Sequence, residues 1–254
     1  MNPKDEAMNS GYAPLTRVHT PRIRTDKAPE KLTAGIPLTK LIKRKLVGHS
    51  GIVMTGSVRS APAESLRSLK ASLLSRAEGP PQVIVVASPG PGEGRSFVAL
   101  NLALAFAAEK GRDVLLVDAD LRKPSIGNWV SPAPTLGFSE VIEARTDLDH
   151  AVLDLVNSPL RILPAGAPPW EPAELLTSDR TKAIFRSLRD RFDTIIIDTP
   201  PILPFVDADV IGALSDGFLL IARAGLTEES TFLQAMSRVT SKPILGRVLN
   251  GAAS

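Results

Sequence analysis

The sequence predicts an α/β fold built on a doubly wound, mainly parallel sheet that is flanked by helices. Two observations favour this fold. Short apolar runs alternate with stretches of helical periodicity, and several runs are apolar throughout, which is typical of parallel strands buried on both faces. Such alternation implies right-handed crossovers between parallel strands. Ligands of these sheets bind beyond the carboxyl ends of the strands, so we expect the functional residues there.

The elements follow from the pattern in chain order. Leucines at helical spacing, with Pro62 near the start, predict a helix over 62–76. A strand at 82–88 is followed by a glycine-rich loop, a helix that ends near Lys110, and a second strand at 113–121. Later strands are expected at 160–166, 193–201, 216–224 and 242–250, and later helices at 172–192 and 227–241.

The chain of 254 residues divides into a basic N-terminal tail, 1–50, and one folded domain, 51–254. Residues 1–48 hold ten Lys or Arg against four Asp or Glu, and scattered prolines predict that the tail is mostly unstructured. The tail is either a solvated leader or a segment that contacts an anionic membrane surface. No recognition motif or aromatic interleaving accompanies the charge, so we expect no nucleic acid partner.

Composition also indicates the cellular compartment and excludes some kinds of chemical site. The chain has no cysteine, which excludes disulfides, thiolate metal sites and cysteine nucleophiles and suits a reducing compartment. Its apolar stretches are shorter than the roughly 20 residues of a membrane span, and its N-terminus is not signal-like. We therefore expect a cytoplasmic protein.

The loop SPGPGEGRS follows the strand at 82–88 and leads into a helix, as phosphate-binding loops do. Its glycines allow backbone N–H groups to approach an anion closely; they are Gly90, Gly92 and Gly94. Ser96 stands where G-x-x-x-x-G-K-[ST] loops bind Mg²⁺. Pro89 and Arg95 depart from that pattern, because they replace its first glycine and its lysine. The alternative is a glycine-rich turn without a ligand.

Three aspartates follow two of the apolar strands. Asp118 and Asp120 leave the second strand two residues apart, where they can hold a metal-bound water or accept a proton. Asp198 ends the run TIIID, a suitable place for a Mg²⁺-linked carboxylate. The alternatives are a solvated strand end paired with Arg122 for the first two, and a helix cap for Asp198.

In order and spacing, several segments together resemble the bacterial tyrosine kinases of polysaccharide assembly. These kinases are P-loop ATPases related to the cell-division and partition ATPases, and the resemblance covers about residues 60 to 251. The segments are PGEGRSFVALNLA, VLLVDADLRKP, LPAG with EPAELL, DTPP with DADVIGALSDGFLLIARAG, and ILGRVLN.

The resemblance implies ATP and Mg²⁺ as cofactors. It implies a nucleotide site at the loop, formed by Gly90, Gly92, Glu93, Gly94, Arg95, Ser96 and Phe97, of which Phe97 can simply pack under the loop. It implies metal binding by Ser96, Asp118 and Asp198, and catalytic roles for Arg95, Asp118 and Asp120. Which aspartate binds the metal and which deprotonates the acceptor stays open.

The segment ESLRSLK is similar to the E-x-x-R-x-x-R motif through which family members assemble into rings. The resemblance implies a homo-oligomer whose interface includes Glu64, Arg67 and Lys70. Lys70 departs from the final arginine and weakens any bidentate contact there. The alternative is three ordinary charges on a helix face.

Two departures leave the activity open. Arg95 keeps the charge of the loop lysine but moves it, and the chain lacks the tyrosine cluster of the family, since Tyr12 is its single tyrosine. One hypothesis is an active tyrosine kinase or ATPase of exopolysaccharide or capsule synthesis at the inner face of the plasma membrane, activated by a membrane-bound chain-length (co-polymerase) protein. The other is a catalytically impaired pseudo-kinase that regulates the same machinery. A partition-type ATPase is a third, less favoured hypothesis.

Overall fold

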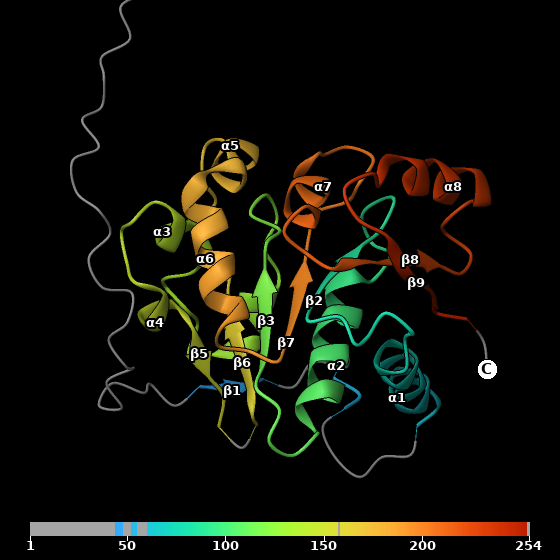
Figure 1. Cartoon of the computed structure of the whole chain (residues 1–254), viewed down its shortest axis with the longest axis horizontal. Coiled ribbons are helices and arrows are strands. Elements are labelled where there is room, and N and C mark those ends of the chain that lie inside the picture. Colours follow the sequence, from blue (N-terminus) through green and yellow to red (C-terminus); the bar gives the residue numbers. More distant parts are fainter. Residues whose placement is uncertain (1–43, 48–51, 55–59, 157, 253–254) are drawn as a thin grey trace, which may run out of the picture. The chain divides into compact units, whose positions relative to one another are not determined.

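The computed structural model describes residues 44–47, 52–54, 60–156 and 158–252 (Figure 1). All of them belong to a compact unit that runs from Leu38 to Ser254. The basic tail predicted at 1–50 lies outside the described residues, apart from residues 44–47. No helix in the described part of the chain is long and apolar enough to cross a membrane.

Seven strands form the central sheet, in the spatial order β5-β6-β3-β7-β2-β8-β9 (Figure 1). Only the pair β5–β6 is antiparallel, which confirms the predicted mainly parallel sheet. The strands are β2 (Val83–Ala87), β3 (Val114–Asp118), β5 (Leu153–Asp154), β6 (Leu160–Leu163), β7 (Thr194–Asp198), β8 (Gly217–Arg223) and β9 (Ile244–Asn250).

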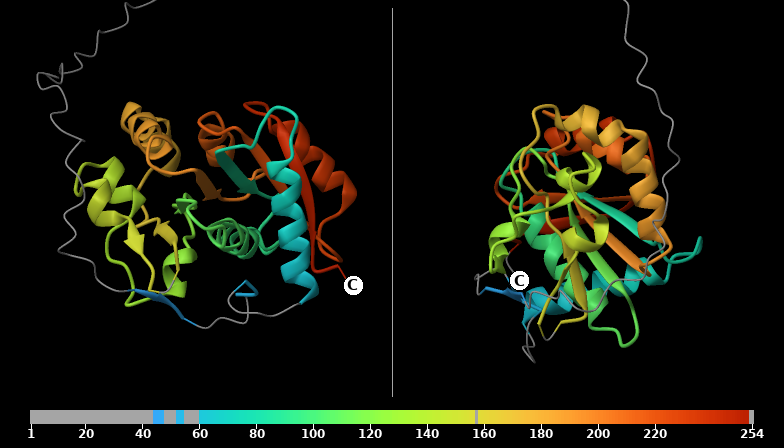
Figure 2. Two further views of the ribbon diagram at one scale, coloured as in Figure 1. Left: turned by 60° about the horizontal axis from the view of Figure 1, so that its bottom comes forward. Right: turned by 90° about the vertical axis from the view of Figure 1, so that its left-hand side faces the viewer.

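Helices cover both faces of this sheet (Figure 2). Alternate strand residues face opposite sides, so Ile84 and Val86 pack with α1 and α2, whereas Val83 and Val85 pack with α3 to α8. The helices are α1 (Ala61–Leu74), α2 (Arg95–Ala107), α3 (Phe138–Ile142), α4 (Leu148–Ala151), α5 (Pro172–Thr177), α6 (Asp179–Arg189), α7 (Asp207–Gly212) and α8 (Glu229–Arg238), with a 3₁₀ turn η2 (Ile126–Trp129).

The stretch predicted as one helix over 172–192 is two helices, α5 and α6. They are separated by Ser178, whose backbone is extended (φ −61°, ψ 152°). Its hydroxyl accepts a hydrogen bond from the N–H of Thr181 at 3.2 Å and so caps α6. A serine that offers this cap competes with continuation of the helix. The backbone therefore breaks at Ser178 even though the apolar periodicity continues across it.

A two-stranded antiparallel sheet pairs β1 (Lys45–Leu46) with β4 (Val130–Ser131). Arg44 donates to the carbonyl of Pro132 at 3.0 Å. Residues 44–47, which fall within the predicted tail, are therefore bound to the folded body.

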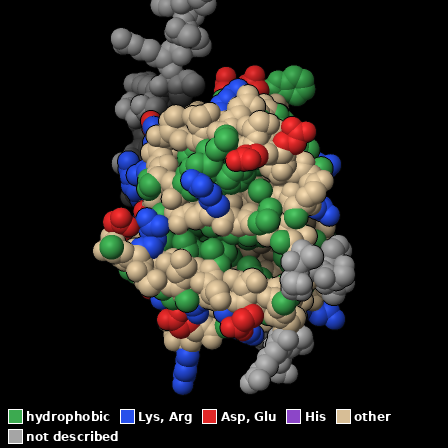
Figure 3. Space-filling view, turned by 90° about the vertical axis from the view of Figure 1, so that its right-hand side faces the viewer, with side chains coloured by type: hydrophobic (Ala, Val, Ile, Leu, Met, Phe, Trp, Pro, Cys, Tyr) green, Lys and Arg blue, Asp and Glu red, His purple; other side chains and the backbone are tan. Residues whose placement is uncertain are grey.

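The strand β9 lies at one edge of the central sheet. Figure 3 looks at the side of the molecule that carries α1, α8 and this edge, and it shows apolar side chains gathered in a hollowed region. The exposed large apolar residues of β9 and α8 are Leu249 and Leu233, with exposed fractions of 62% and 54%. This edge is far in the strand order from β6 and close to the glycine loop after β2.

Candidate nucleotide site

The glycine loop joins the end of β2 to the start of α2, as predicted. Gly92 and Gly94 have φ angles of +79° and +93°, a left-handed conformation that glycine adopts without strain. Gly94 is also the residue that precedes α2. A Cβ atom added there would lie 2.1 Å from the side-chain amide of Asn250. The loop thus needs glycine at both positions for its turn, and at Gly94 also for its contact with β9.

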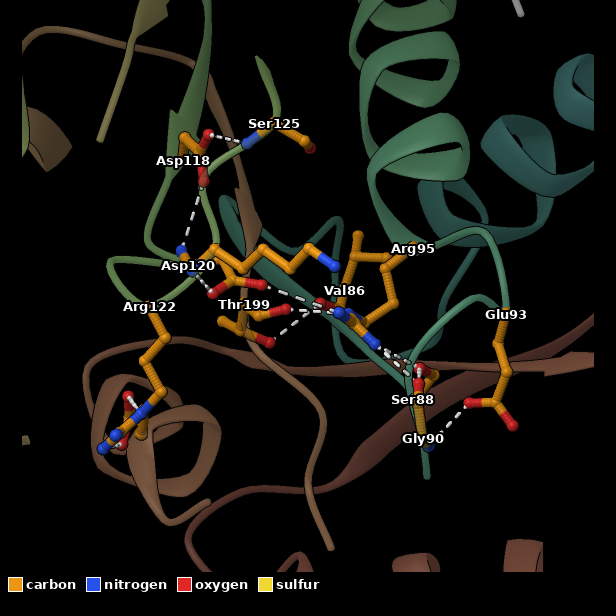
Figure 4. A network of polar contacts seen from close by, with 12 residues as sticks. Val86, Ser88, Gly90, Glu93, Arg95, Asp118, Asp120, Arg122, Ser125 and Thr199 are labelled. Carbon is orange, nitrogen blue, oxygen red and sulfur yellow. Dashed lines mark hydrogen bonds and ion pairs between the residues drawn. The ribbon is translucent and has the colours of Figure 1, made fainter. Parts of the chain in front are cut away.

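Arg95 folds back across the loop and lies between the ends of β2 and β7 (Figure 4). Its Nε donates to the carbonyl of Thr199 at 2.8 Å, and its Nη1 donates to both the hydroxyl of Ser88 and the carbonyl of Gly90 at 2.8 Å. The Nη2 atom lies 3.6 Å from a carboxylate oxygen of Asp120, and the side chain is only 10% exposed. The guanidinium is therefore bound mainly to the protein's own oxygens.

Glu93 is buried in the loop, with 3% exposure. One carboxylate oxygen accepts the N–H of Gly90 at 2.8 Å, and the other accepts the hydroxyl of Thr227. Gly90 was predicted to help form the nucleotide site, but in this structure a carboxylate of the same loop accepts its N–H. Nucleotide binding at Gly90 would require this internal hydrogen bond to open.

Residues at the ends of β8 and β9 hold the loop from its other side. Arg223 donates to the carbonyl of Gly92 at 2.8 Å, and the side chain of Asn250 donates to the carbonyl of Glu93 at 3.0 Å. Neither residue, nor Thr227, was among the predicted site residues. Asn250 stands in the segment ILGRVLN that carries the family resemblance, whereas Thr227 has no local motif that marks it.

Asp118 and Asp198 lie side by side at the carboxyl ends of β3 and β7, because they are paired in the register of the two strands. Both are buried, with 0% and 1% exposure. Asp118 accepts the N–H groups of Ser125 and Ile126 at 3.2 and 3.0 Å. Neither carboxylate oxygen of Asp198 has a hydrogen-bond partner of good geometry among the described residues. The sheet has thus brought two of the predicted metal ligands together.

Burial raises the pKa of all three carboxyl groups. It raises the pKa of Asp198 to about 7, against the opposing effects of the Ser96 hydroxyl and of Arg95. Burial, followed by the charge of Asp198, raises the pKa of Asp118 well above its ordinary value. Burial also raises the pKa of Asp120, where the N–H of Lys123 and then Arg95 oppose it. A cation placed between such groups would restore their charged forms.

The structure does not support the two alternatives for the aspartates, a solvated strand end paired with Arg122 and a helix cap. Asp118 and Asp120 are buried rather than solvated, and Arg122 is not their main partner. Arg122 instead makes two hydrogen bonds with the buried carboxylate of Asp207, at 2.7 and 2.9 Å. Asp198 caps no helix, since the residue before α7 is Val206.

The remaining predicted residues are divided between site and core. Ser96 stands in the first turn of α2 and influences the charge of Asp198. Phe97 is partly buried and packs against the cluster formed by α1, α2 and one face of the sheet. The side chain of Phe97 thus packs against the core.

The three predicted interface residues of α1 do not share one environment. Glu64 and Arg67 form an exposed ion pair at 2.8 Å. Lys70 turns toward α2, where its ammonium donates to the carbonyl of Ala105 at 3.1 Å and lies 3.2 Å from Glu109. Only the first two residues therefore face outward on α1.

The donors present fit a nucleotide with Mg²⁺. Mg²⁺ is usually held by one or two carboxylates together with phosphate oxygens and water, and Asp198 offers two buried oxygens without a hydrogen-bond partner of good geometry among the described residues. No group of three His, Asp or Glu side chains among the described residues could hold a metal alone. The arrangement therefore suits a metal that arrives with phosphates, rather than one resident in a protein cage.

Comparisons with known proteins agree with a nucleotide site at this edge of the sheet. The family model described as "AAA domain" matches residues 81–223, from just before β2 to the end of β8. "Tyrosine-protein kinase YwqD" of Bacillus subtilis is 36% identical over 170 residues, which are 66% of this chain and 71% of that protein. "Succinoglycan biosynthesis transport protein ExoP" of Rhizobium meliloti is 32% identical over 207 residues, which are 78% of this chain but only 26% of ExoP.

Solved structures show the same fold. The kinase domain of the Escherichia coli tyrosine kinase ETK superposes with a TM-score of 0.71 at 29% identity, covering 77% of each chain. The chimerical protein CapA2B2 gives a TM-score of 0.75 at 25% identity, covering 83% of this chain and 93% of that one. The septum site-determining protein MinD of Pyrococcus horikoshii, complexed with Mg-ADP, shares the fold at a TM-score of 0.54 and 23% identity, covering 66% of this chain and 69% of that one.

Proposed function

Because this chain belongs to the bacterial tyrosine kinase family, we propose that it binds Mg·ATP at the carboxyl edge of β2, β7 and β3 and phosphorylates tyrosine side chains. The chain covers only 26% of ExoP and of the Escherichia coli tyrosine kinase etk. Its place in exopolysaccharide or capsule synthesis is part of the same proposal.

One observation carries the proposal: two buried carboxylates, Asp118 and Asp198, meet in register beside the glycine loop and Ser96. Burying two carboxyl groups together is costly unless a cation or a proton neutralises them. A fold that only needed a core would place apolar residues at these strand ends. The arrangement is therefore best explained by a divalent cation that binds between the strands and the loop.

The chain's own groups would then bind the phosphates, hold the metal and accept the proton. The N–H groups from Glu93 to Ser96 would surround the phosphates at the start of α2, and Ser96 and Asp198 would hold the metal. Asp118 or Asp120 would accept the proton of the tyrosine hydroxyl. Bound Mg·ATP would supply the phosphoryl group, with ADP as the leaving group, and the metal would offset the phosphate charge.

Arg95 supports a second candidate function, a catalytically impaired subunit with a regulatory or assembly role. Its three hydrogen bonds to Thr199, Ser88 and Gly90 keep the guanidinium on protein oxygens. A loop lysine acts as a mobile point charge on the β and γ phosphates. A guanidinium held in this way gives less stabilisation to the charge that develops in the transition state.

The test is the release of ADP from Mg·ATP by the full chain, together with the transfer of phosphate to a synthetic peptide rich in Glu and Tyr. We expect slow turnover by the native chain, faster turnover by Arg95→Lys, and none by Asp198→Asn. Asp179→Asn is the matched control, because Asp179 is 97% exposed on α6, and it should behave like the native chain.

The outcomes separate the two candidate functions. Turnover by the native chain that is lost in Asp198→Asn supports an active kinase. Turnover only after Arg95→Lys supports the impaired subunit. If no variant turns over and calorimetry detects no binding of Mg·ADP to the native chain, both proposals are wrong.

The wider context belongs to the same proposal. We propose that the chain acts in the cytoplasm at the inner face of the membrane, assembles with copies of itself through Glu64 and Arg67, and is activated by a membrane-bound chain-length protein. The similarity to a transport protein of succinoglycan biosynthesis supports this context. The basic tail, proposed to contact an anionic membrane surface, lies outside the described residues apart from 44–47.

A further inference from the structure

Two basic residues, Arg122 and Lys123, follow the aspartates at the end of β3, and they lie in different surroundings. Arg122 donates two hydrogen bonds to the buried carboxylate of Asp207 at 2.7 and 2.9 Å, and its Cζ atom lies 4.2 Å from the ring centre of Phe205. Figure 4 shows its side chain directed away from the glycine loop. Arg122 thus links the loop after β3 to the start of α7, and its charge is paired within the protein.

Lys123, in contrast, has an unpaired side chain. Its backbone N–H donates to the carboxylate of Asp120 at 2.9 Å, and the residue is exposed. Within the part of the chain that the structure describes, the Lys123 ammonium makes no hydrogen bond or ion pair. Asp120 lies across the site from the glycine loop, where it is 3.6 Å from Nη2 of Arg95 (Figure 4). Lys123 is therefore a free cation whose backbone is fixed beside the site.

The proposed kinase reaction requires the γ-phosphate of ATP at the same edge. The transferring group must lie between the loop that binds the phosphates and the acceptor hydroxyl, which the proposed function puts next to Asp118 or Asp120. Both aspartates are buried, as is Asp198. A γ-phosphate at this edge meets carboxyl groups, so cations must offset the repulsion between them. Mg²⁺ supplies part of that charge, and a side-chain cation within reach would supply more.

Arg95, which stands in the position of the loop lysine, is not free to take this role. Its side chain is 10% exposed and donates three hydrogen bonds to protein oxygens. To reach a phosphate it would have to leave buried acceptors without a partner, which is costly. An ammonium on a flexible four-carbon stem can act from outside the loop. It needs only a backbone anchored beside the site, and the hydrogen bond from the Lys123 N–H to Asp120 provides that anchor.

We propose that the ammonium of Lys123 binds the γ-phosphate of ATP and supplies the mobile positive charge that the glycine loop lacks; this role rests on the proposed nucleotide site. The anchor at Asp120 sets the charge on the side of the γ-phosphate that faces the acceptor. ADP has no phosphate there, because its terminal phosphate lies deeper in the loop. Lys123 should therefore distinguish ATP from ADP, through a hydrogen bond between two charged groups.

The experiment is isothermal titration calorimetry of the full chain with Mg·ADP and with the Mg²⁺ complex of AMP-PNP, an ATP analogue that is not hydrolysed. We expect Lys123→Gln to weaken binding of AMP-PNP about tenfold and binding of ADP about twofold at most, because only AMP-PNP has a γ-phosphate. Lys123→Arg keeps the charge and should recover most of the loss. Lys110→Gln is the matched control, since Lys110 is also exposed but precedes β3 at the opposite end of that strand.

A double variant tests whether Lys123 substitutes for the missing loop lysine. Arg95→Lys restores a cation that can reach the γ-phosphate from the loop. In that background, Lys123→Gln should weaken binding of AMP-PNP about twofold at most, because two cations that act on one phosphate are not additive. Circular dichroism and the affinity for Mg·ADP report whether each variant is folded.

Three results would overturn the proposal: an equal loss for ADP and AMP-PNP in Lys123→Gln, an equal loss in Lys110→Gln, which would reduce the effect to net charge, or a loss of the same size in the Arg95→Lys background. The assay needs no turnover, so it is separate from the kinase test. If the native chain binds both nucleotides and Lys123→Gln changes neither affinity, this inference fails alone. If the native chain binds neither nucleotide, the proposed nucleotide site fails with it.

Discussion

At the scale of single residues, Arg95 bears on both stability and chemistry. It contributes three hydrogen bonds that bridge the loop after β2 and the end of β7. A lysine has one nitrogen in place of the planar fork and cannot make all of these contacts at once. The same substitution that frees a charge for phosphates therefore removes a structural bridge.

We predict that Arg95→Met lowers the free energy of unfolding by about 2–4 kcal/mol, because it leaves buried acceptors and the carboxylate of Asp120 without their partner. Urea denaturation of the nucleotide-free chain measures this change. Arg223→Met is the comparison, since Arg223 makes one exposed hydrogen bond to the loop, and we expect it to cost about 1 kcal/mol or less. Equal losses in the two variants would show that Arg95 does not bridge the strands in solution.

At the scale of elements, the sheet brings the site together by register, and polar links at its opposite end hold the strands. Asp216, just before β8, accepts the N–H groups of Gln82 and Val83 at the start of β2, both at 2.8 Å. Arg189, the last residue of α6, donates to the same carboxylate at 2.7 Å. One side chain thus links two strands and a helix at the amino ends of the sheet.

This link predicts a pH dependence. Burial raises the pKa of Asp216, but the hydrogen bonds from Arg189 and from the N–H groups of Val83 and Gln82 outweigh it and hold the pKa below its ordinary value. A carboxyl group with a lowered pKa in the folded state stabilises the fold above its ordinary pKa, and that contribution is lost as the pH falls through the folded value.

Asp216→Asn should therefore destabilise the chain by about 1–2 kcal/mol at pH 7, after allowance for solvent screening, and by progressively less as the pH falls below about 4. Denaturation measured from pH 7 down to about pH 2 compares the variant with the native chain. A loss that is independent of pH would mean that the carboxylate charge contributes nothing. Asp179→Asn, at an exposed position of α6, is the control and should show a much smaller change.

At the scale of the whole molecule, assembly depends on which charges of α1 remain outward. Glu64 and Arg67 are exposed and paired with each other, whereas Lys70 is 19% exposed and engaged with α2. An exposed ion pair of this kind contributes at most about 1 kcal/mol to the stability of a single chain. Its loss should therefore affect association more than folding.

We predict that Glu64→Ala combined with Arg67→Ala reduces the oligomeric fraction seen by light scattering, with little change in the unfolding midpoint. Asp179→Ala combined with Lys182→Ala removes a similarly spaced pair from α6 and should leave assembly unchanged. Lys70→Ala should instead lower stability, because it removes the contact with Ala105. If both double variants assemble like the native chain, Glu64 and Arg67 lie outside the interface.

The sequence by itself determined the features that depend only on residues close together along the chain. The central strands, the glycine loop and the aspartates at the ends of β3 and β7 were predictable, because apolar runs and glycine spacing report local backbone preference and burial. The break between α5 and α6 at Ser178 was not predicted, because apolar periodicity continues across it.

Only the tertiary structure decided the partners of the side chains. Arg95 bonds to Thr199, 104 residues away in sequence, and Glu93 to Thr227, 134 residues away. Lys70 likewise turns to α2 rather than outward. The physical reason is that such contacts follow from the order and register of strands that are distant in sequence, and a single loop motif contains no information about which residues the sheet will bring to its side.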